Sequence, residues 1–214
     1  MKKLFALLAV VLAVVSCQKD VDNLDVNMGG GQLVDITISL PEATRAQSNL
    51  GFQIPDDLGS EYDLRYILEI YPENTDKVYR DVRYSDNTSV SFPVSIVAGQ
   101  KYTFAVWADI VKQVENPTDF YYNTASLKSI SIIDANWNAM DEKRDAFTGC
   151  ATLQTGNLSE VNSITLTRPF AKLRAVATDI TKLTDLGHEP KAVKVTYAQN
   201  MYTQFDATTS TASV

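Results

Sequence analysis

Few side chains in this sequence have the types and spacing that catalysis or metal binding requires. The single histidine, His188, lies within residues 186–190, where a glycine and a proline flank it and predict a solvated turn. Cys150 lies in an apolar stretch with no histidine near it in the sequence, which favours a small buried residue on a strand over a nucleophile. Neither residue shows the partners that a zinc site or a serine–histidine triad would need.

Two pairs of neighbouring acidic residues raise two further kinds of chemistry. Asp56-Asp57 and Asp141-Glu142 offer carboxylates for glycoside hydrolysis or for calcium binding. Their spacing supports neither reaction nor ion, and the basic residues at positions 143 and 144 indicate a solvated turn at the second pair. A phosphate-binding glycine loop and a CxxC motif are also absent from the sequence. We therefore predict no catalytic residues, no metal ligands and no cofactor, and we do not expect an enzyme.

Cys17 has the clearest chemical role, because the residues before it have the pattern of a signal peptide. Two lysines at positions 2 and 3 precede an apolar run over residues 4–15. This run is too short to span the roughly 30 Å hydrocarbon core of a bilayer. Residues 14–17, Val-Val-Ser-Cys, resemble the bacterial lipobox. We predict that residues 1–16 are a signal peptide, that cleavage follows Ser16, and that Cys17 is acylated and attaches the protein to a membrane.

The residues after Cys17 predict a flexible tether over residues 17–32. They combine aspartates and asparagines with the run Gly29-Gly30-Gly31 and contain few large apolar side chains. Acidic residues after an acylated cysteine resemble the surface-export signal of Bacteroidetes lipoproteins, which indicates the outer membrane and the cell surface. The formal net charge is −7, and loss of residues 1–16 would remove two lysines and no acidic residue. This acidity argues against nucleic acid as a partner.

The chain beyond the tether has the period-two pattern of β-strands. Apolar residues alternate with polar ones from Val34 to Leu40, before Pro41 ends the pattern. The same alternation recurs over residues 64–70, 90–96, 102–108 and 164–167, and shorter patterns follow at residues 173–176 and 193–197. No helical stripe of comparable length occurs. Many short strands separated by turns predict an antiparallel β-sandwich or barrel.

Domain boundaries follow from these patterns. Residues 33–180 are enough for one β-sandwich domain with its own core. Residues 181–214 begin with a charged connector, contain one strand-like segment and end in a polar sequence. We expect either a polar C-terminus or, in preference, the start of an incomplete second β domain.

Aromatic side chains form the candidate binding surface. Tyr121 and Tyr122 lie in a long polar insertion over residues 113–124, and Trp137 lies further along the chain. Such a group can contact a partner or a glycan, but tyrosines also pack against the edge of a sandwich, and that alternative is favoured. Trp107 lies on the opposite strand face from Phe104 and Val106, so one of these two sets should be exposed unless both faces of the sheet are covered.

Three segments carry a resemblance to a known group of proteins, together with the lipobox. They are the first strand running into residues 40–46, the strand pair over residues 98–108, and residues 165–174, Thr-Leu-Thr-Arg-Pro-Phe-Ala-Lys-Leu-Arg. With these segments the chain resembles the fimbrillin-like cell-surface lipoproteins of Bacteroidetes, which are related to fimbrial subunits. The resemblance implies a transthyretin-like or immunoglobulin-like β-sandwich, commonly followed by a second sandwich.

The resemblance also implies a way of assembling. In fimbrial members a protease cuts after an arginine that follows the first strand, and a strand of the next subunit fills the groove that is left. Arg45 stands at the matching place, although a solvated loop arginine is an equal alternative. The chain lacks a complete second domain or a clear donor strand, which leaves polymerisation open.

Two functions follow from these observations. The first is a fimbrial or fimbria-associated subunit that supports adhesion and has other fimbrial or surface proteins as partners. The second is a monomeric surface lipoprotein that binds a glycan or a protein through exposed aromatic residues. The exposure of the tryptophans discriminates between them.

Overall fold

Alternating apolar residues form the strands of the fold in a computed structural model. It describes residues 31–41, 61–75, 78–85, 87–136, 138, 141–153, 162–171, 177–189, 191–192, 194–196, 198 and 201–214. The described residues are almost entirely strands and connecting turns, which confirms the predicted all-β sandwich. The strands are β1 (Gln32–Ser39), β2 (Tyr62–Pro72), β3 (Tyr79–Tyr84), β4 (Ser89–Ile96), β5 (Tyr102–Lys112), β6 (Tyr122–Asn123), β7 (Ile130–Ile132), β8 (Ala146–Leu153), β9 (Ser163–Thr165), β10 (Gln204–Asp206) and β11 (Thr211–Ser213).

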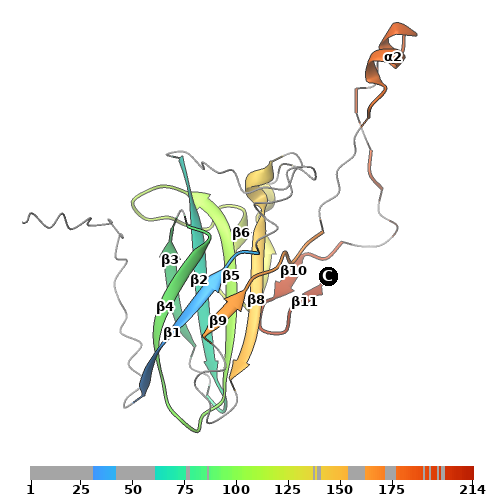
Figure 1. The fold of residues 1–214 in the computed structure, drawn as a ribbon. Helices are drawn as coiled ribbons and strands as arrows, with labels where there is room; N and C mark the ends of the chain where they lie inside the picture. The colour runs from blue at the N-terminus through green and yellow to red at the C-terminus, as the bar shows by residue number, and fades with distance from the viewer. Residues whose placement is uncertain are drawn as a thin grey trace, which may run out of the picture.

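The strands make three sheets (Figure 1). The front sheet has the order β4-β1-β9, the central sheet β3-β2-β5-β8, and the outer sheet β11-β10-β7-β6. All neighbouring strands are antiparallel except β1 and β9, which are parallel. Two short 3-10 helices, η2 (Asp134–Asn136) and η3 (Glu142–Arg144), precede β8.

The main core lies between the front and central sheets. It is built from the residues that the period-two pattern placed on one face of each strand, including Ile36 and Ile38 of β1, Phe92 of β4, and Tyr66 of β2. Phe104 of β5 joins them, and all five side chains are almost fully buried. The predicted alternation therefore identified the inward faces of these strands correctly.

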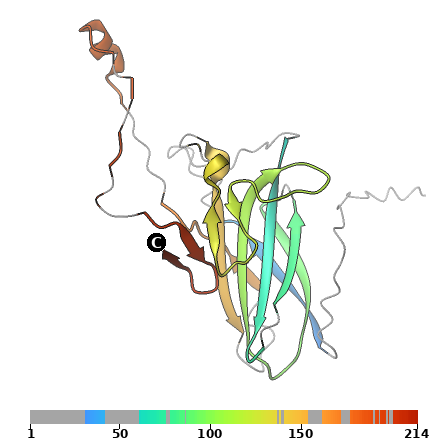
Figure 2. The same ribbon diagram turned by 180° about the vertical axis from the view of Figure 1, so that it is seen from behind.

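A second core lies on the opposite face of the central sheet. Ile67 of β2 and Trp107 of β5 contact Tyr122 of β6, Ile130 of β7 and Phe205 of β10 in one buried cluster. Figure 2 shows β10 and β11 beside β8. Both faces of the central sheet are therefore covered, which explains why Trp107 is buried although it points away from Phe104 and Val106.

The residues after β9 first extend away from the sheets and then pair with them again near the end of the described chain. Helix α2 (Ile180–Asp185) buries no residue and projects away from the sheets in both ribbon views (Figures 1 and 2). The predicted strand at residues 173–176 lies outside the described residues, and the described residues 194–196 are not in a strand. The last strands then pair with the sandwich, because β10 is antiparallel to β7 and to β11. Residues 204–213 of the expected second domain thus extend the outer sheet.

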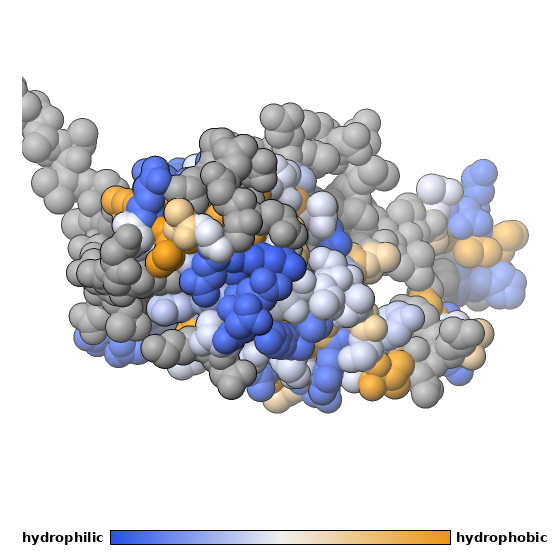
Figure 3. Space-filling model, turned by 90° about the horizontal axis from the view of Figure 1, so that it is seen from below, coloured by the Kyte–Doolittle hydropathy of each residue, from blue (hydrophilic) through white to orange (hydrophobic). Residues whose placement is uncertain are grey.

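The lower end of the sandwich carries the turns between β2 and β3 and between β4 and β5. Seen from below, hydrophilic residues gather at the centre of this end, with smaller hydrophobic areas at its margins (Figure 3). Lys101 and Glu73 form an exposed ion pair between the two turns, with 3.2 Å between Nζ and Oε1. Within the described residues, no helix has the length and apolar character needed to cross a membrane.

Candidate functional site

The first strand occupies the centre of the front sheet. Strand β1 pairs antiparallel with β4 over its whole length, from Gln32 opposite Ile96 to Ser39 opposite Ser89. On its other side it pairs in parallel with β9. Because β1 comes first in the sequence and β4 and β9 come later, the sheet is completed by a strand from near the N-terminus of the chain.

Burial of alternate side chains fixes β1 in this place. Ile36 and Ile38 are 1% and 0% exposed, and Leu40 just after the strand is 5% exposed. Their neighbours Thr37 and Ser39 lie on the other face of the sheet, as the side-chain period of two requires. Burying a large aliphatic side chain contributes roughly 1.5–3 kcal/mol. Three such side chains therefore give β1 a strong but purely non-covalent hold on the sandwich.

Backbone hydrogen bonds reach β1 and its end from both sides. On the β4 side, the Leu40 N–H donates to the Thr88 carbonyl at 2.8 Å. On the β9 side, the Thr37 N–H donates to the Asn162 carbonyl at 2.9 Å, and the Leu166 N–H donates to the Ser39 carbonyl at 2.8 Å. Loss of β1 would therefore leave unpaired groups on two strands that face each other across a gap.

The outer edges of the front sheet are protected, in contrast to the place that β1 fills. Pro93 of β4 has no N–H to offer another strand, and Arg83 of β3 donates from Nη1 to the Ser91 carbonyl at 2.8 Å. Beyond β9, Thr148 of β8 and Thr167 exchange two backbone hydrogen bonds of 2.8 and 2.9 Å. Among the described residues, an added strand therefore meets obstacles at both edges.

A buried ion pair on the other face of the central sheet fixes the outer layer. Arg65 of β2 binds Asp109 of β5 through two hydrogen bonds of 2.8 and 2.7 Å, and these two side chains are 5% and 0% exposed. The same guanidinium donates from Nη1 to Asp119 at 2.8 Å, and Asp119 accepts the N–H and the hydroxyl of Thr124 at 2.7 Å each. The loop before β6 is therefore bound to the sheet by charge-assisted hydrogen bonds.

The pKa values of this network follow from its hydrogen bonds. Burial alone would lower the pKa of Arg65, but attraction and hydrogen bonds from Asp109 and Asp119 raise it above its usual value. Burial would raise the pKa of Asp119, but hydrogen bonds from Thr124 and Arg65 lower it. These groups are therefore charged and paired, which is the behaviour of a structural network rather than of a proton-transfer site.

A second charged residue of β2 also binds the outer layer. The carboxylate of Glu69, 3% exposed, accepts the Leu127 N–H at 2.9 Å and is also bonded to the Tyr71 hydroxyl and to Arg80. Sequence reasoning did not single out Arg65, Glu69 or Asp109. The available signal was the presence of charged residues inside otherwise apolar strand patterns, since such residues are seldom fully buried unless they are paired.

The predicted aromatic contact residues are buried where the structure describes them. Tyr121 is 3% exposed, Tyr122 is 6% exposed, and Trp107 is fully buried. Tyr122 lies edge-on to Trp107 with ring centroids 5.2 Å apart and stacks on Phe170 with centroids 6.1 Å apart. The favoured alternative, in which the tyrosines pack on the sandwich, is confirmed. Trp137 lies outside the described residues.

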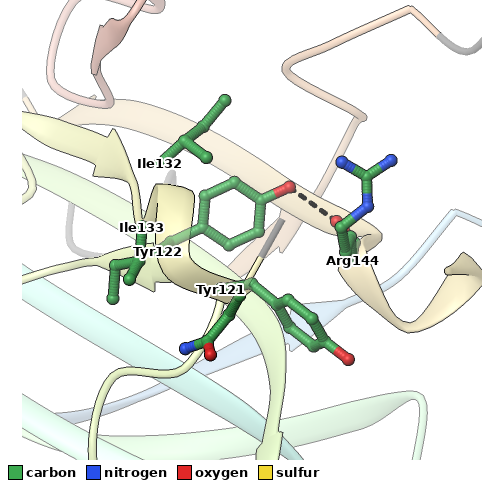
Figure 4. A pocket seen from close by; sticks show the side chains of 6 residues that line it. Tyr121, Tyr122, Ile132, Ile133 and Arg144 are labelled. Carbon is green, nitrogen blue, oxygen red and sulfur yellow. Dashed lines mark hydrogen bonds between the residues drawn. The ribbon is translucent and has the colours of Figure 1, made fainter. Parts of the chain in front are cut away.

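A small pocket beside these tyrosines is too small for a ligand. It has about 10 Å³ of space and is lined by Tyr121, Tyr122, Ile132, Ile133, Asn136 and Arg144. This volume suits about one water molecule. Figure 4 shows the Tyr122 hydroxyl directed at the Arg144 backbone carbonyl, to which it donates at 2.6 Å.

The two remaining nucleophile and acid–base candidates, His188 and Cys150, are both exposed. His188 is exposed after the end of α2, as predicted. The expectation that Cys150 is buried is wrong, because Cys150 lies on β8 but is exposed. Its thiol lies 3.0 Å from the Thr208 carbonyl, and local desolvation with the nearby Asp206 raises its pKa. A raised pKa keeps the thiol protonated, which disfavours a nucleophile.

The other sequence candidates lie outside the described residues. These are the acylation site Cys17, the cleavage site Arg45 and the acidic pair at positions 56 and 57. The position of Arg45 in the chain is nevertheless informative, because it lies between the end of β1 and the start of β2. A cut after Arg45 would separate β1, with everything that precedes it, from the remaining strands.

Comparison with known proteins gives one match. A family of unknown function, DUF6562, matches residues 27–213, a range that includes all eleven described strands. Curated proteins and solved structures gave no match. Because the family model matches most of the chain, this protein belongs to the family of unknown function DUF6562.

Proposed function

We propose that this protein is a lipid-anchored structural or adhesion protein of the cell surface, a fimbrial or fimbria-associated subunit that assembles by β-strand exchange. The observation that carries the proposal is the placement of β1 at the centre of the front sheet, ahead of the segment that contains Arg45. One cut after Arg45 would make β1 exchangeable without breaking any other strand among the described residues.

The place of β1 has the features that strand exchange requires. Strands β4 and β9 would present backbone donors and acceptors to an incoming strand, and these give affinity. The sites of Ile36, Ile38 and Leu40 would accept alternate apolar side chains, and these give specificity. A strand with apolar residues at every second position, supplied by another fimbrial or surface protein, therefore fits this place.

The protected edges of the front sheet support exchange over simple addition. Pro93 and Arg83 obstruct the edge at β4, and the bridge between Thr148 and Thr167 joins the other side to the central sheet. A partner strand can complete the same hydrogen bonds only where β1 now lies. This geometry favours assembly that begins with proteolysis rather than with free association of intact copies.

The order of the segments links assembly to the membrane. Acylation at Cys17 would anchor the protein in the outer membrane, and the tether and β1 would connect the anchor to the sandwich. The bond after Arg45 lies between the anchor and the central sheet. Cleavage there would leave β1 held to the sandwich only by non-covalent contacts, so that replacement of β1 by a partner strand would also free the sandwich from the lipid.

The experiment is treatment of residues 18–214, the mature chain without the acylated Cys17, with an arginine-specific protease, followed by mass and sedimentation measurements. We expect one cut, after Arg45, and then species whose size grows with protein concentration. The matched control is Arg45→Lys, which keeps the charge and should remain uncut and monomeric. Resistance at Arg45, or a cut protein that stays monomeric at every concentration, would contradict strand exchange between copies.

A further inference from the structure

Strand β1 is the common partner of the other two strands of the front sheet. Among the described strands, β4 and β9 each pair with β1 and with no other strand (Figure 1). Their buried side chains, including Phe92 on β4 and Ile164 on β9, belong to the same core as Ile38 of β1. The front sheet, and the side of the main core that it covers, are therefore held together through β1.

An empty β1 place would be unfavourable for the cut protein. The backbone groups of β4 and β9 that now pair with β1 would lose their partners, and unpaired backbone groups beside a core are destabilising. The apolar side chains that pack against Ile36 and Ile38 would also meet water. If β1 left before a partner strand entered, the protein would pass through this state. If the partner strand paired while β1 was still partly bound, the protein would avoid it.

The two halves of β1 are held very differently. In the first half, residues 32–35, Leu33 is 70% exposed and Val34 packs against the main core but is only partly buried. Among the described strands, this half pairs with β4 alone. In the second half, residues 36–40, the apolar side chains are buried, and backbone hydrogen bonds reach both β4 and the β9 side. We therefore expect β1 to separate from the sheet first at residues 32–35.

We propose that a partner strand enters the front sheet at the first half of β1 and displaces β1 step by step toward Leu40. The entering strand pairs first with residues 93–96 of β4, which lie opposite residues 32–35. It then extends along β4 and β9 as β1 separates, so the β1 place is never empty. This inference rests on the proposed strand exchange and adds its route. A cut copy keeps β1 until a partner strand arrives, which protects the main core between cleavage and assembly.

The test measures how fast cut protein takes up a strand. Residues 18–214, cut after Arg45, are mixed with an excess of a fluorescent peptide of residues 32–41, and fluorescence anisotropy follows binding. We expect the observed exchange rate to rise in proportion to the peptide concentration, because the peptide takes part in the slow step. A rate that becomes independent of the peptide concentration would mean that β1 leaves first, and it would overturn the proposal.

Two matched peptide variants locate the point of entry. Val34→Ala changes the first half of the strand, and Leu40→Ala changes the far end, where the native side chain is more deeply buried. We expect Val34→Ala to slow exchange roughly threefold, and Leu40→Ala to leave the exchange rate nearly unchanged while the bound peptide dissociates faster. Equal slowing by the two variants, or greater slowing by Leu40→Ala, would place the entry elsewhere and contradict the proposed route.

These outcomes separate the route from strand exchange itself. If the protein is not cut after Arg45, or if the cut protein takes up no peptide, both proposals fail. If the peptide binds at a rate that is independent of its concentration, or if the two variants do not differ as expected, strand exchange stands and the proposed route is wrong.

Discussion

At the scale of single residues, the buried pair of Arg65 and Asp109 shows how the central sheet is joined to the loop that covers its outer face. The carboxylate has no access to water and accepts two hydrogen bonds from one guanidinium. The guanidinium then reaches Asp119 in the loop that covers the outer face of the central sheet. A charge in this position is tolerated only while its partner is present.

Replacing the carboxylate should therefore destabilise the protein strongly. We expect Asp109→Asn to lower the free energy of unfolding by about 3 kcal/mol, because it leaves a buried guanidinium with half of its charge compensation. The measurement is urea denaturation of the mature protein. Asp81→Asn is the control, because its ion pair with Arg83 is partly exposed, and it should change the stability by no more than about 0.5 kcal/mol. Equal effects of the two substitutions would contradict the assigned role.

Single-residue chemistry was predictable from the sequence only in part. The solvated position of His188 followed from local turn residues, and the burial of Tyr121 and Tyr122 followed from the general behaviour of tyrosine. The exposure of Cys150 did not follow, because cysteine is usually buried, and its contact with Thr208 joins residues that are far apart in the chain.

At the scale of elements, the front and central sheets lie in close contact where β8 passes β9 and the residues that follow it. A Cβ atom on Gly149 would lie 2.8 Å from Ile164 Cγ2 and 2.8 Å from Leu166 Cδ2. Both neighbours are buried core residues, so they have little room to move. This contact packs β8 of the central sheet against β9, the edge strand of the front sheet on the side away from β4.

Adding a single methyl group at the contact between β8 and β9 should destabilise the protein. We expect Gly149→Ala to lower the free energy of unfolding by about 1–3 kcal/mol through overpacking. Thermal and urea unfolding of the mature protein test this prediction. The control is Gly187→Ala, which strains a positive φ of +82° in the exposed segment but meets no atom within 4 Å. A stability loss at Gly149 no greater than at Gly187 would disprove the close contact.

The strands themselves were the most predictable elements. Alternation along β1, β2, β4 and β5 identified their inward faces, because one face of each packs into the main core. The outer layer was not predicted. Its strands β6, β7, β10 and β11 have two or three residues each, too few to show a period, and Phe205 reaches the second core across a long separation in sequence.

At the scale of the whole molecule, three layers of strands share one central sheet. The last strands return to the outer face, while the first strand fills the middle of the front face. The front and outer layers are thus separated by the central sheet. Replacement of β1 would therefore leave the ion pair of Arg65 and Asp109 and the second core in place, so the body of the molecule could stay folded during strand exchange.

The most direct test of strand exchange uses a fluorescent peptide that corresponds to residues 32–41. Protein cut after Arg45 should bind this peptide saturably and release its own β1 fragment, whereas uncut protein should not bind it. An Ile38→Asp peptide should fail, because it would place a charge at a site where the native side chain is fully buried. Absence of binding to the cut protein, or equal binding to the cut and uncut proteins, would contradict the proposed exchange.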